Sequence, residues 1–246
     1  DVLGSRGLGD VYKRQESGSL TWTEDNLTWT LTADGTLTIS GKGEMKDYSS
    51  DSPATQISGS VNKVVIQEGV TSIGNGAFQG CSSLTDITIP DSVTSIGDHA
   101  FSWCSSLTDI TIPGSVTSIG DYAFLNCTGL TSINIPEGVT SIENYAFDSC
   151  NKLASITIPS SVTSIGVGVF NHCSSLKEVL LENGSTLTSE NLGVNESQIA
   201  TYWNEDNLTW TLDADGTMTI SGTGPMRDYF HDSPATQKED LSLIHI

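Results

Sequence analysis

Apolar residues recur along this chain with a period of 23 between residues 70 and 184. Five consecutive segments open with Val-Thr-Ser-Ile, and they start at Val70, Val93, Val116, Val139 and Val162. A short fixed period is typical of a solenoid, in which each unit buries its apolar face only against its neighbours. The pattern therefore predicts a mainly β solenoid with short parallel strands.

One repeat is enough to predict where these strands lie. In residues 84–89, Ile87 and Ile89 are two positions apart, which places both on one face of a short strand. Pro90 ends this strand because it has no N–H to donate to a ladder. Residues 70–74 predict a second extended segment, and residues 75–81 predict a helical or 3₁₀ turn that carries Phe78 inward.

Stacking of the repeats aligns identical residues in columns, with neighbouring strands about 4.8 Å apart. The first predicted core column is aromatic and consists of Phe78, Phe101, Phe124, Phe147 and Phe170. The second holds all five cysteines, namely Cys81, Cys104, Cys127, Cys150 and Cys173.

The cysteines do not have the spacing of a metal site, because no CxxC occurs and each repeat supplies one thiol. Cα atoms at the strand spacing are within reach of a disulfide. However, side chains of parallel strands do not converge, and the number of cysteines is odd. We therefore expect a buried, reduced column, with disulfides or a thiol site as the alternative.

The repeat VTSIG..AF..C.SLT.ITIP resembles the BspA-type leucine-rich repeat of bacterial cell-surface proteins. The resemblance covers residues 61 to about 182, and Val61, Val64 and Ile66 supply a further strand before the first full repeat. It implies a right-handed leucine-rich-repeat solenoid that serves adhesion and protein binding. It also implies an extracellular or cell-surface location in a bacterium.

A second kind of repeat flanks the array, since residues 24–56 and 205–237 match at 26 of 33 positions. Leu27, Trp29 and Leu31 alternate with threonines, and the Asp34-Gly35 pair predicts a tight turn before the next strand. We therefore expect small antiparallel β-hairpin modules at 16–56 and 202–240, around a solenoid at 57–184 and a polar linker at 185–201. The first module is expected to cap the open edge of the solenoid.

The two ends of the chain have an unusual relationship at the level of DNA. Residues 10–15 (DVYKRQ) and 241–246 (LSLIHI) can be encoded by complementary strands of one DNA tag, of the kind used in sequencing libraries. We therefore expect 1–15 and 241–246 to be adapter-like tails without structural partners, and the chain to be a slice of a longer protein. A coincidence of two ordinary tails is the alternative.

The chain is acidic, with 30 Asp and Glu against 10 Lys and Arg and a net charge of −20. Such a charge disfavours nucleic acids and anionic membrane surfaces as partners, and we expect no direct membrane insertion of this part. No catalytic motif is found in a consistent context, so we expect neither an enzyme nor a cofactor. Residues 213–216 (Asp-Ala-Asp-Gly) suggest calcium, but a hairpin turn fits them better, and we expect no metal site.

The predicted binding surface is the outward face of the 84–89 type strands, which we call the strand face. Its candidate residues are the polar ones in three columns, namely Thr85, Asp86, Thr88, Thr108, Asp109, Thr111, Thr131, Ser132 and Asn134. The predicted partner is an extracellular protein or glycan, since solenoids bind along such extended faces. The alternatives are a structural spacer and, through the regular threonines, ice binding.

Overall fold

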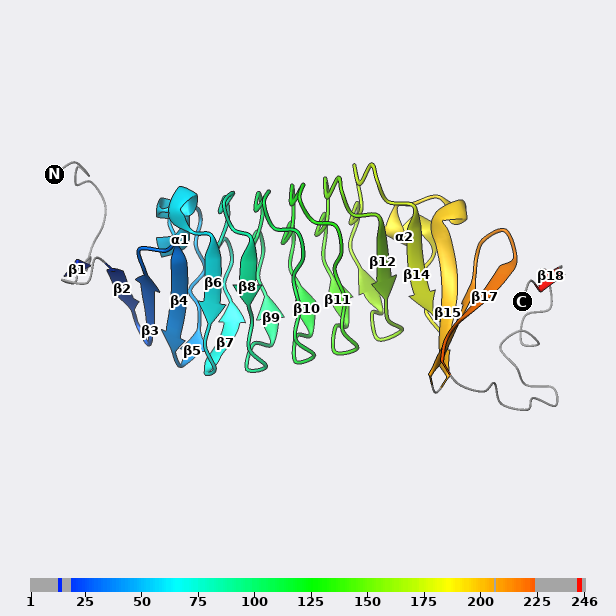
Figure 1. Cartoon of the computed structure of the whole chain (residues 1–246), viewed down its shortest axis with the longest axis horizontal. Coiled ribbons are helices and arrows are strands. Elements are labelled where there is room, and N and C mark those ends of the chain that lie inside the picture. The colour runs from blue at the N-terminus through cyan, green and yellow to red at the C-terminus, as the bar shows by residue number, and fades with distance from the viewer. Residues whose placement is uncertain (1–12, 15–18, 206, 224–242, 245–246) are drawn as a thin grey trace.

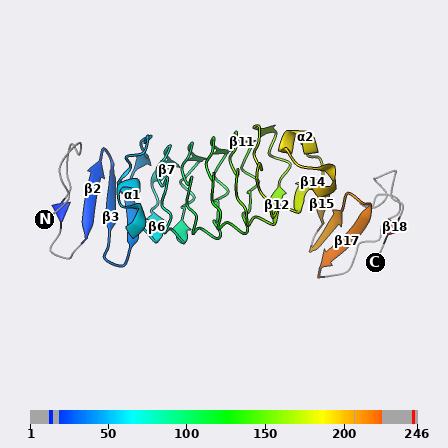
Figure 2. The ribbon, with the colours of Figure 1, turned by 90° about the horizontal axis from the view of Figure 1, so that it is seen from above.

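The computed structural model describes residues 13–14, 19–205, 207–223 and 243–244. The chain forms one extended stack of coils with the two hairpin modules at opposite ends (Figure 1). Two rows of strands run along this stack, with β6, β12 and β14 on one side and β7 and β11 on the other (Figure 2). The predicted mainly β solenoid is confirmed.

The first row consists of β5 and the Val-Thr-Ser-Ile segments, which pair in parallel so that each residue lies opposite its equivalent in the next repeat. Ser95 pairs with Ser118, and Ser118 pairs with Ser141. This row is a single sheet of β5 (Gly43–Glu44), β7 (Val70–Ile73), β9 (Ser95–Ile96), β10 (Ser118–Ile119), β11 (Ser141–Ile142) and β13 (Ser164–Ile165).

The second row carries the strand face and is regular only toward its ends. Its strands are β6 (Lys63–Ile66), β8 (Asp86–Thr88), β12 (Ser155–Ile158) and β14 (Glu178–Glu182). Between β8 and β12, isolated bridges join Thr111 to Asn134 and Asn134 to Thr157. A full strand in every repeat was therefore a wrong expectation for the two middle repeats, although Thr131 N–H still bonds Thr108 O there at 2.9 Å.

The predicted core columns are confirmed. The phenylalanine rings stack along the axis with centroid separations of 5.4, 5.3, 5.3 and 5.8 Å, and Trp29 continues the column at 5.8 Å from Phe78. All five cysteines are free thiols, four of them buried and Cys173 half-buried. Burial of each phenylalanine contributes roughly 1.5–3 kcal/mol to the stability of the stack.

The segment after each Val-Thr-Ser-Ile strand forms successive single turns, so the expected helical or 3₁₀ element does not form as a regular helix. Three i→i+3 bonds occur within residues 74–81 of the first repeat, including Ala77 N–H to Gly74 O at 3.2 Å. Gly76 and Gly80 lie between them with φ of 63° and 74°. Left-handed residues cannot extend a right-handed helix, and so the turns stay separate.

The N-terminal module caps the solenoid as expected. It consists of the antiparallel strands β2 (Leu20–Glu24), β3 (Leu27–Leu31) and β4 (Thr36–Gly41). β4 then pairs in parallel with β6, so the sheet of the module continues into the strand face. The connection holds α1 (Pro53–Gln56), capped by Ser52, and a 3₁₀ turn at Ser58–Ser60.

The C-terminal module continues the other end of the same row. β15 (Ile199–Glu205) pairs in parallel with β14, and β16 (Leu208–Leu212) and β17 (Thr217–Gly222) follow in antiparallel order. The segment 185–201, expected as a linker, carries α2 (Ser189–Leu192), a 3₁₀ turn at Glu196–Gln198 and the start of β15. It also buries Leu192 completely, so this segment packs on the solenoid end.

Parts of the terminal tails pair with these modules. β1 (Lys13–Arg14) pairs with β2, and β18 (Leu243–Ile244) pairs with β17. The expectation that the tails lie without partners is wrong for these four residues, because an outer strand presents free N–H and C=O groups to any nearby chain. The rest of 1–15 and 241–246 lies outside the described residues.

Candidate functional site

All nine residues predicted for the strand face are exposed in the structure. Buried isoleucines alternate with them, as with Ile87 at 8% exposure between Asp86 and Thr88. The two-residue period of extended backbone places the polar residues outward. Their position is as predicted, and their part in binding stays a prediction.

Hydrogen bonds to the neighbouring repeat fix part of this face. The hydroxyl of Thr85 donates to Asn62 O, and that of Thr131 donates to Thr108 O, both at 3.1 Å. These side chains are held in one rotamer, so less conformational entropy remains to be lost when a partner binds.

The charges of the strand face are distributed unevenly. Lys63 Nζ lies 2.6 Å from Asp86 Oδ2, which partly neutralises this carboxylate. Asp109, one repeat further, has no ion pair among the described residues. Of the two carboxylates among the nine candidate residues, that of Asp109 therefore carries the free negative charge.

Toward the C-terminal module the strand face runs into a hollow of about 530 Å³. Asn134 and Thr157 line it from the repeats, with Leu180 beyond them on β14. Tyr202 and Asn204 line it from β15. We call this space the junction hollow, and Asn134 is the one predicted site residue that reaches it.

Leu180 and Val65 mark the two ends of the polar columns. Both are half-buried, as expected for apolar residues that adjoin the flanking modules. Val65 pairs with Thr38 of β4, and Leu180 pairs with Ala200 of β15.

Burial and neighbouring acidic groups raise pKa values around the junction hollow. Burial, and then the charge of Glu182, raise the pKa of Glu137 above its ordinary value. Burial, followed by the charges of Glu182 and Glu137, raises the pKa of Tyr202 to about 12. Tyr202 is therefore a neutral phenol at physiological pH, beside two carboxylates.

The sequence patterns did not indicate Glu137, Glu182 or Tyr202 as site residues. A comparison of the two module copies, started a few residues before the matched ranges, would have singled out Tyr202. Tyr202 and Asn204 stand where the first copy has Thr21 and Thr23. The C-terminal copy thus differs from its repeat at residues that line the hollow.

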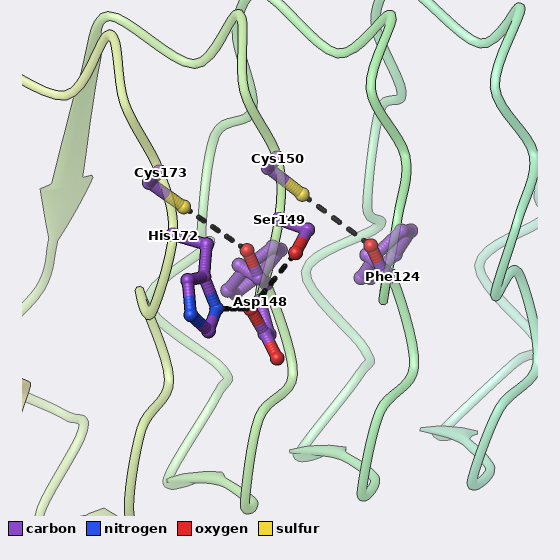
Figure 3. A network of polar contacts seen from close by, with 7 residues as sticks. Phe124, Asp148, Ser149, Cys150, His172 and Cys173 are labelled. Atoms are coloured by element: carbon purple, nitrogen blue, oxygen red, sulfur yellow. Dashed lines mark hydrogen bonds and ion pairs between the residues drawn. The ribbon is translucent and has the colours of Figure 1, made fainter.

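The cysteine column offers no reactive thiol. Each Sγ from Cys104 onward donates to the carbonyl of a phenylalanine in the preceding repeat, as Figure 3 shows for Cys150 with Phe124. Burial raises the pKa of Cys81 and Cys127 to about 12 and that of Cys173 to about 11. Since the thiolate is the nucleophile and metal ligand, these groups serve packing.

The edge of the stack near these thiols carries one ionic contact. His172 Nδ1 lies 2.8 Å from Asp148 Oδ1, which also accepts a bond from the Ser149 hydroxyl at 3.0 Å (Figure 3). His172 is highly exposed, so this contact contributes little to stability.

The Asp-Ala-Asp-Gly segment forms the turn between β16 and β17. Asp215 Oδ1 accepts the N–H of Thr217 at 2.9 Å, and hydrogen bonds from Thr217 lower the pKa of Asp215. The hairpin interpretation of this segment is confirmed.

Within the part of the chain that the structure describes, no group of three or more His, Cys, Asp or Glu side chains is placed to hold a metal ion. No helix among these residues has the length and apolar character needed to cross a bilayer.

Comparisons with solved structures find bacterial repeat proteins. A leucine-rich repeat protein from Bacteroides capillosus is 29% identical, with a TM-score of 0.38, over 66% of this chain and 99% of that chain. A leucine rich cell surface protein from Faecalibacterium prausnitzii is 27% identical, with a TM-score of 0.42, over 80% of this chain and 60% of that chain. The pneumococcal vaccine antigen PcpA is 20% identical, with a TM-score of 0.49, over 78% of this chain and 53% of that chain.

No curated protein matches the chain. The model of the BspA type leucine-rich repeat region matches it in six copies, over residues 55–177 and 94–202. These ranges together cover more than half of the sequence and agree with the stacked coils from β6 onward. The chain therefore belongs to the BspA-type leucine-rich repeat family.

Proposed function

We propose that this chain is a non-enzymatic adhesion or protein-interaction module, working outside the cell or on its surface and binding through the strand face. The observation that carries this proposal is the set of nine exposed polar side chains on a backbone already fixed by its neighbours. Membership of a repeat family used for surface recognition supports it. The partner is an extracellular protein or a glycan.

Binding by such a face accumulates along the array. The polar columns repeat at each coil, and the hydrogen bonds of Thr85 and Thr131 hold part of them in place before a partner arrives. A partner then loses little additional entropy from this side of the interface. The free charge at Asp109 favours a basic or cation-bridged partner, whose binding weakens as salt rises.

A structural spacer is the second candidate function. The near-identity of the five repeats and the uninterrupted phenylalanine column favour it, because a stalk needs only stiffness. Ice binding is disfavoured, because the hydroxyls of Thr85 and Thr131 donate to backbone carbonyls of the stack.

The test is capture of host matrix and microbial surface components by the chain and by an Asp109→Lys variant. Glu143→Lys is the matched control, because it makes the same charge change next to β11, on the other strand row. We expect capture by the unmodified chain and the control, and reduced capture by Asp109→Lys. Equal capture by all three removes the strand face from the proposal, and capture of nothing favours the spacer.

A further inference from the structure

The junction hollow has the size of a small-ligand site. Its volume of about 530 Å³ lies within the usual range of roughly 300–1,000 Å³ for such sites. The hollow is lined by the polar residues Asn134, Asn204 and Glu137 and by the apolar residues Leu180 and Pro136. A ligand that fits it therefore has a polar group and an apolar part.

Tyr202 supplies an unused hydrogen-bonding group. The residue is 7% exposed and lines the hollow, yet its hydroxyl has no hydrogen-bond partner among the described residues. Tyr48 behaves differently, since its hydroxyl donates to Glu24. A ligand with a matching polar group supplies the partner that this hydroxyl lacks within the chain.

Two carboxylates lie beside this phenol without a counterion. Glu182 pairs with Tyr202 across β14 and β15, and it accepts the N–H of Ser160 at 2.8 Å. The charge of Glu182 acts on Glu137, which lines the hollow. Among the described residues, neither carboxylate has a Lys, Arg or His partner, and none of those residue types lines the hollow.

The geometry points to a lysine side chain of a protein partner as the occupant of the junction hollow. Its ammonium group lies at Glu137 and the Tyr202 hydroxyl, and its four-carbon stem lies along Leu180 and Pro136. The three donors of a compact ammonium match the carboxylate and phenol oxygens that line the hollow, and the negative charge of Glu182 adds to the attraction. A lysine stem packs on apolar surface while its charged head stays with polar groups.

This inference rests on the proposed function in taking the partner to be a protein. Its test does not depend on the proposed function, because the probe is a single blocked amino acid. Nα-acetyl-lysine methylamide is titrated into the full chain and followed by NMR, with Nα-acetyl-norleucine methylamide as the probe that keeps the stem without the ammonium. We expect saturable shifts with the lysine probe and at least about tenfold weaker binding of the norleucine probe, a ratio equal to about 1.4 kcal/mol.

Variants locate the binding within the hollow. We expect Glu137→Gln to weaken lysine binding about tenfold and Tyr202→Phe to weaken it severalfold. The matched control is Asp91→Asn, because Asp91 occupies the same repeat position as Glu137 two repeats away. Thermal unfolding of each variant verifies that it is folded. None of the three substitutions changes the size of the side chain appreciably.

Three results would overturn the inference: equal binding of both probes, unchanged binding by Glu137→Gln, or binding of N-acetylglucosamine in place of lysine. If the lysine probe fails while Asp109→Lys still reduces capture of a partner, the proposed function stands and this inference falls. If the lysine probe binds as expected while no partner is captured, the inference stands and the proposed function falls.

Discussion

The Asp121 carboxylate accepts two hydrogen bonds from Asn144 of the next repeat, from its backbone N–H at 2.8 Å and from its side-chain amide at 2.9 Å. The same backbone bond recurs along the stack, from Asp98 N–H to Asn75 and from Asp121 N–H to Asp98. These side chains therefore form a polar ladder that joins the turns of successive repeats.

Substitution of Asp121 tests the ladder. Asp121→Ala leaves Asn144 N–H without its acceptor, so we expect it to lower the free energy of unfolding by about 1–2 kcal/mol. Asp121→Asn keeps an acceptor oxygen, as Asn75 does naturally, and is expected to stay within about 0.5 kcal/mol of the unmodified chain. Urea unfolding measures both, and equal stability of the two variants would contradict a role for the ladder.

The phenylalanine column predicts a position-dependent loss of stability. Phe124 stacks on a ring at each side, 5.3 Å away in both directions, and is fully buried. We expect Phe124→Ala to destabilise by about 3–5 kcal/mol. Phe170 stacks on one ring of the column and is 4% exposed, so Phe170→Ala is expected to destabilise less. A larger loss of stability for Phe170→Ala than for Phe124→Ala in urea unfolding would show that ring stacking within the column does not determine the stability.

The thiol column predicts sensitivity to alkaline pH. The pKa of Cys127 rises from its ordinary 9.0 to about 12 on folding, and that of Cys81 rises equally. Because the folded values lie above the unfolded ones, the stabilisation is complete below pH 9 and is lost as the pH rises toward 12. We expect about 1 kcal/mol of loss per thiol at one pH unit above 9.

The measurement for this prediction is the urea midpoint at pH 8, 9 and 10. Lysines and tyrosines titrate in the same pH range, so a Cys127→Ala variant, which removes one thiol and leaves those groups in place, is the control. We expect the urea midpoint of this variant to fall less steeply with pH than that of the unmodified chain. Parallel pH curves for the two proteins would argue against the thiols as the cause.

The terminal tails are expected to contribute little, although β1 and β18 pair with the modules. Each of these strands has only two residues. Removal of 1–15 and 241–246 should change the free energy of unfolding by less than about 1 kcal/mol, the usual size for surface changes. Thermal unfolding of the shortened chain measures this, and a larger loss would give the tails a structural part.

The part of the fold that repeats was predictable from the sequence. Phe124 and Cys127 could be placed in the core because each repeat buries the same positions against its neighbour. The hairpin at residues 32–36 was predictable from Asp34-Gly35, because turn chemistry is local. The exposure of Thr88 and Asp109 followed from the alternation of the strand.

Only the tertiary structure decided what happens where the repetition ends. Glu137 and Tyr202 are far apart in sequence, and both line the junction hollow because β15 adds to β14 and so ends the array next to the strand face. No periodic pattern contains that arrangement, since it joins a repeat to a module with a different period. Periodicity fixes what each residue does within its own coil, whereas the junction hollow depends on how two different units pack together.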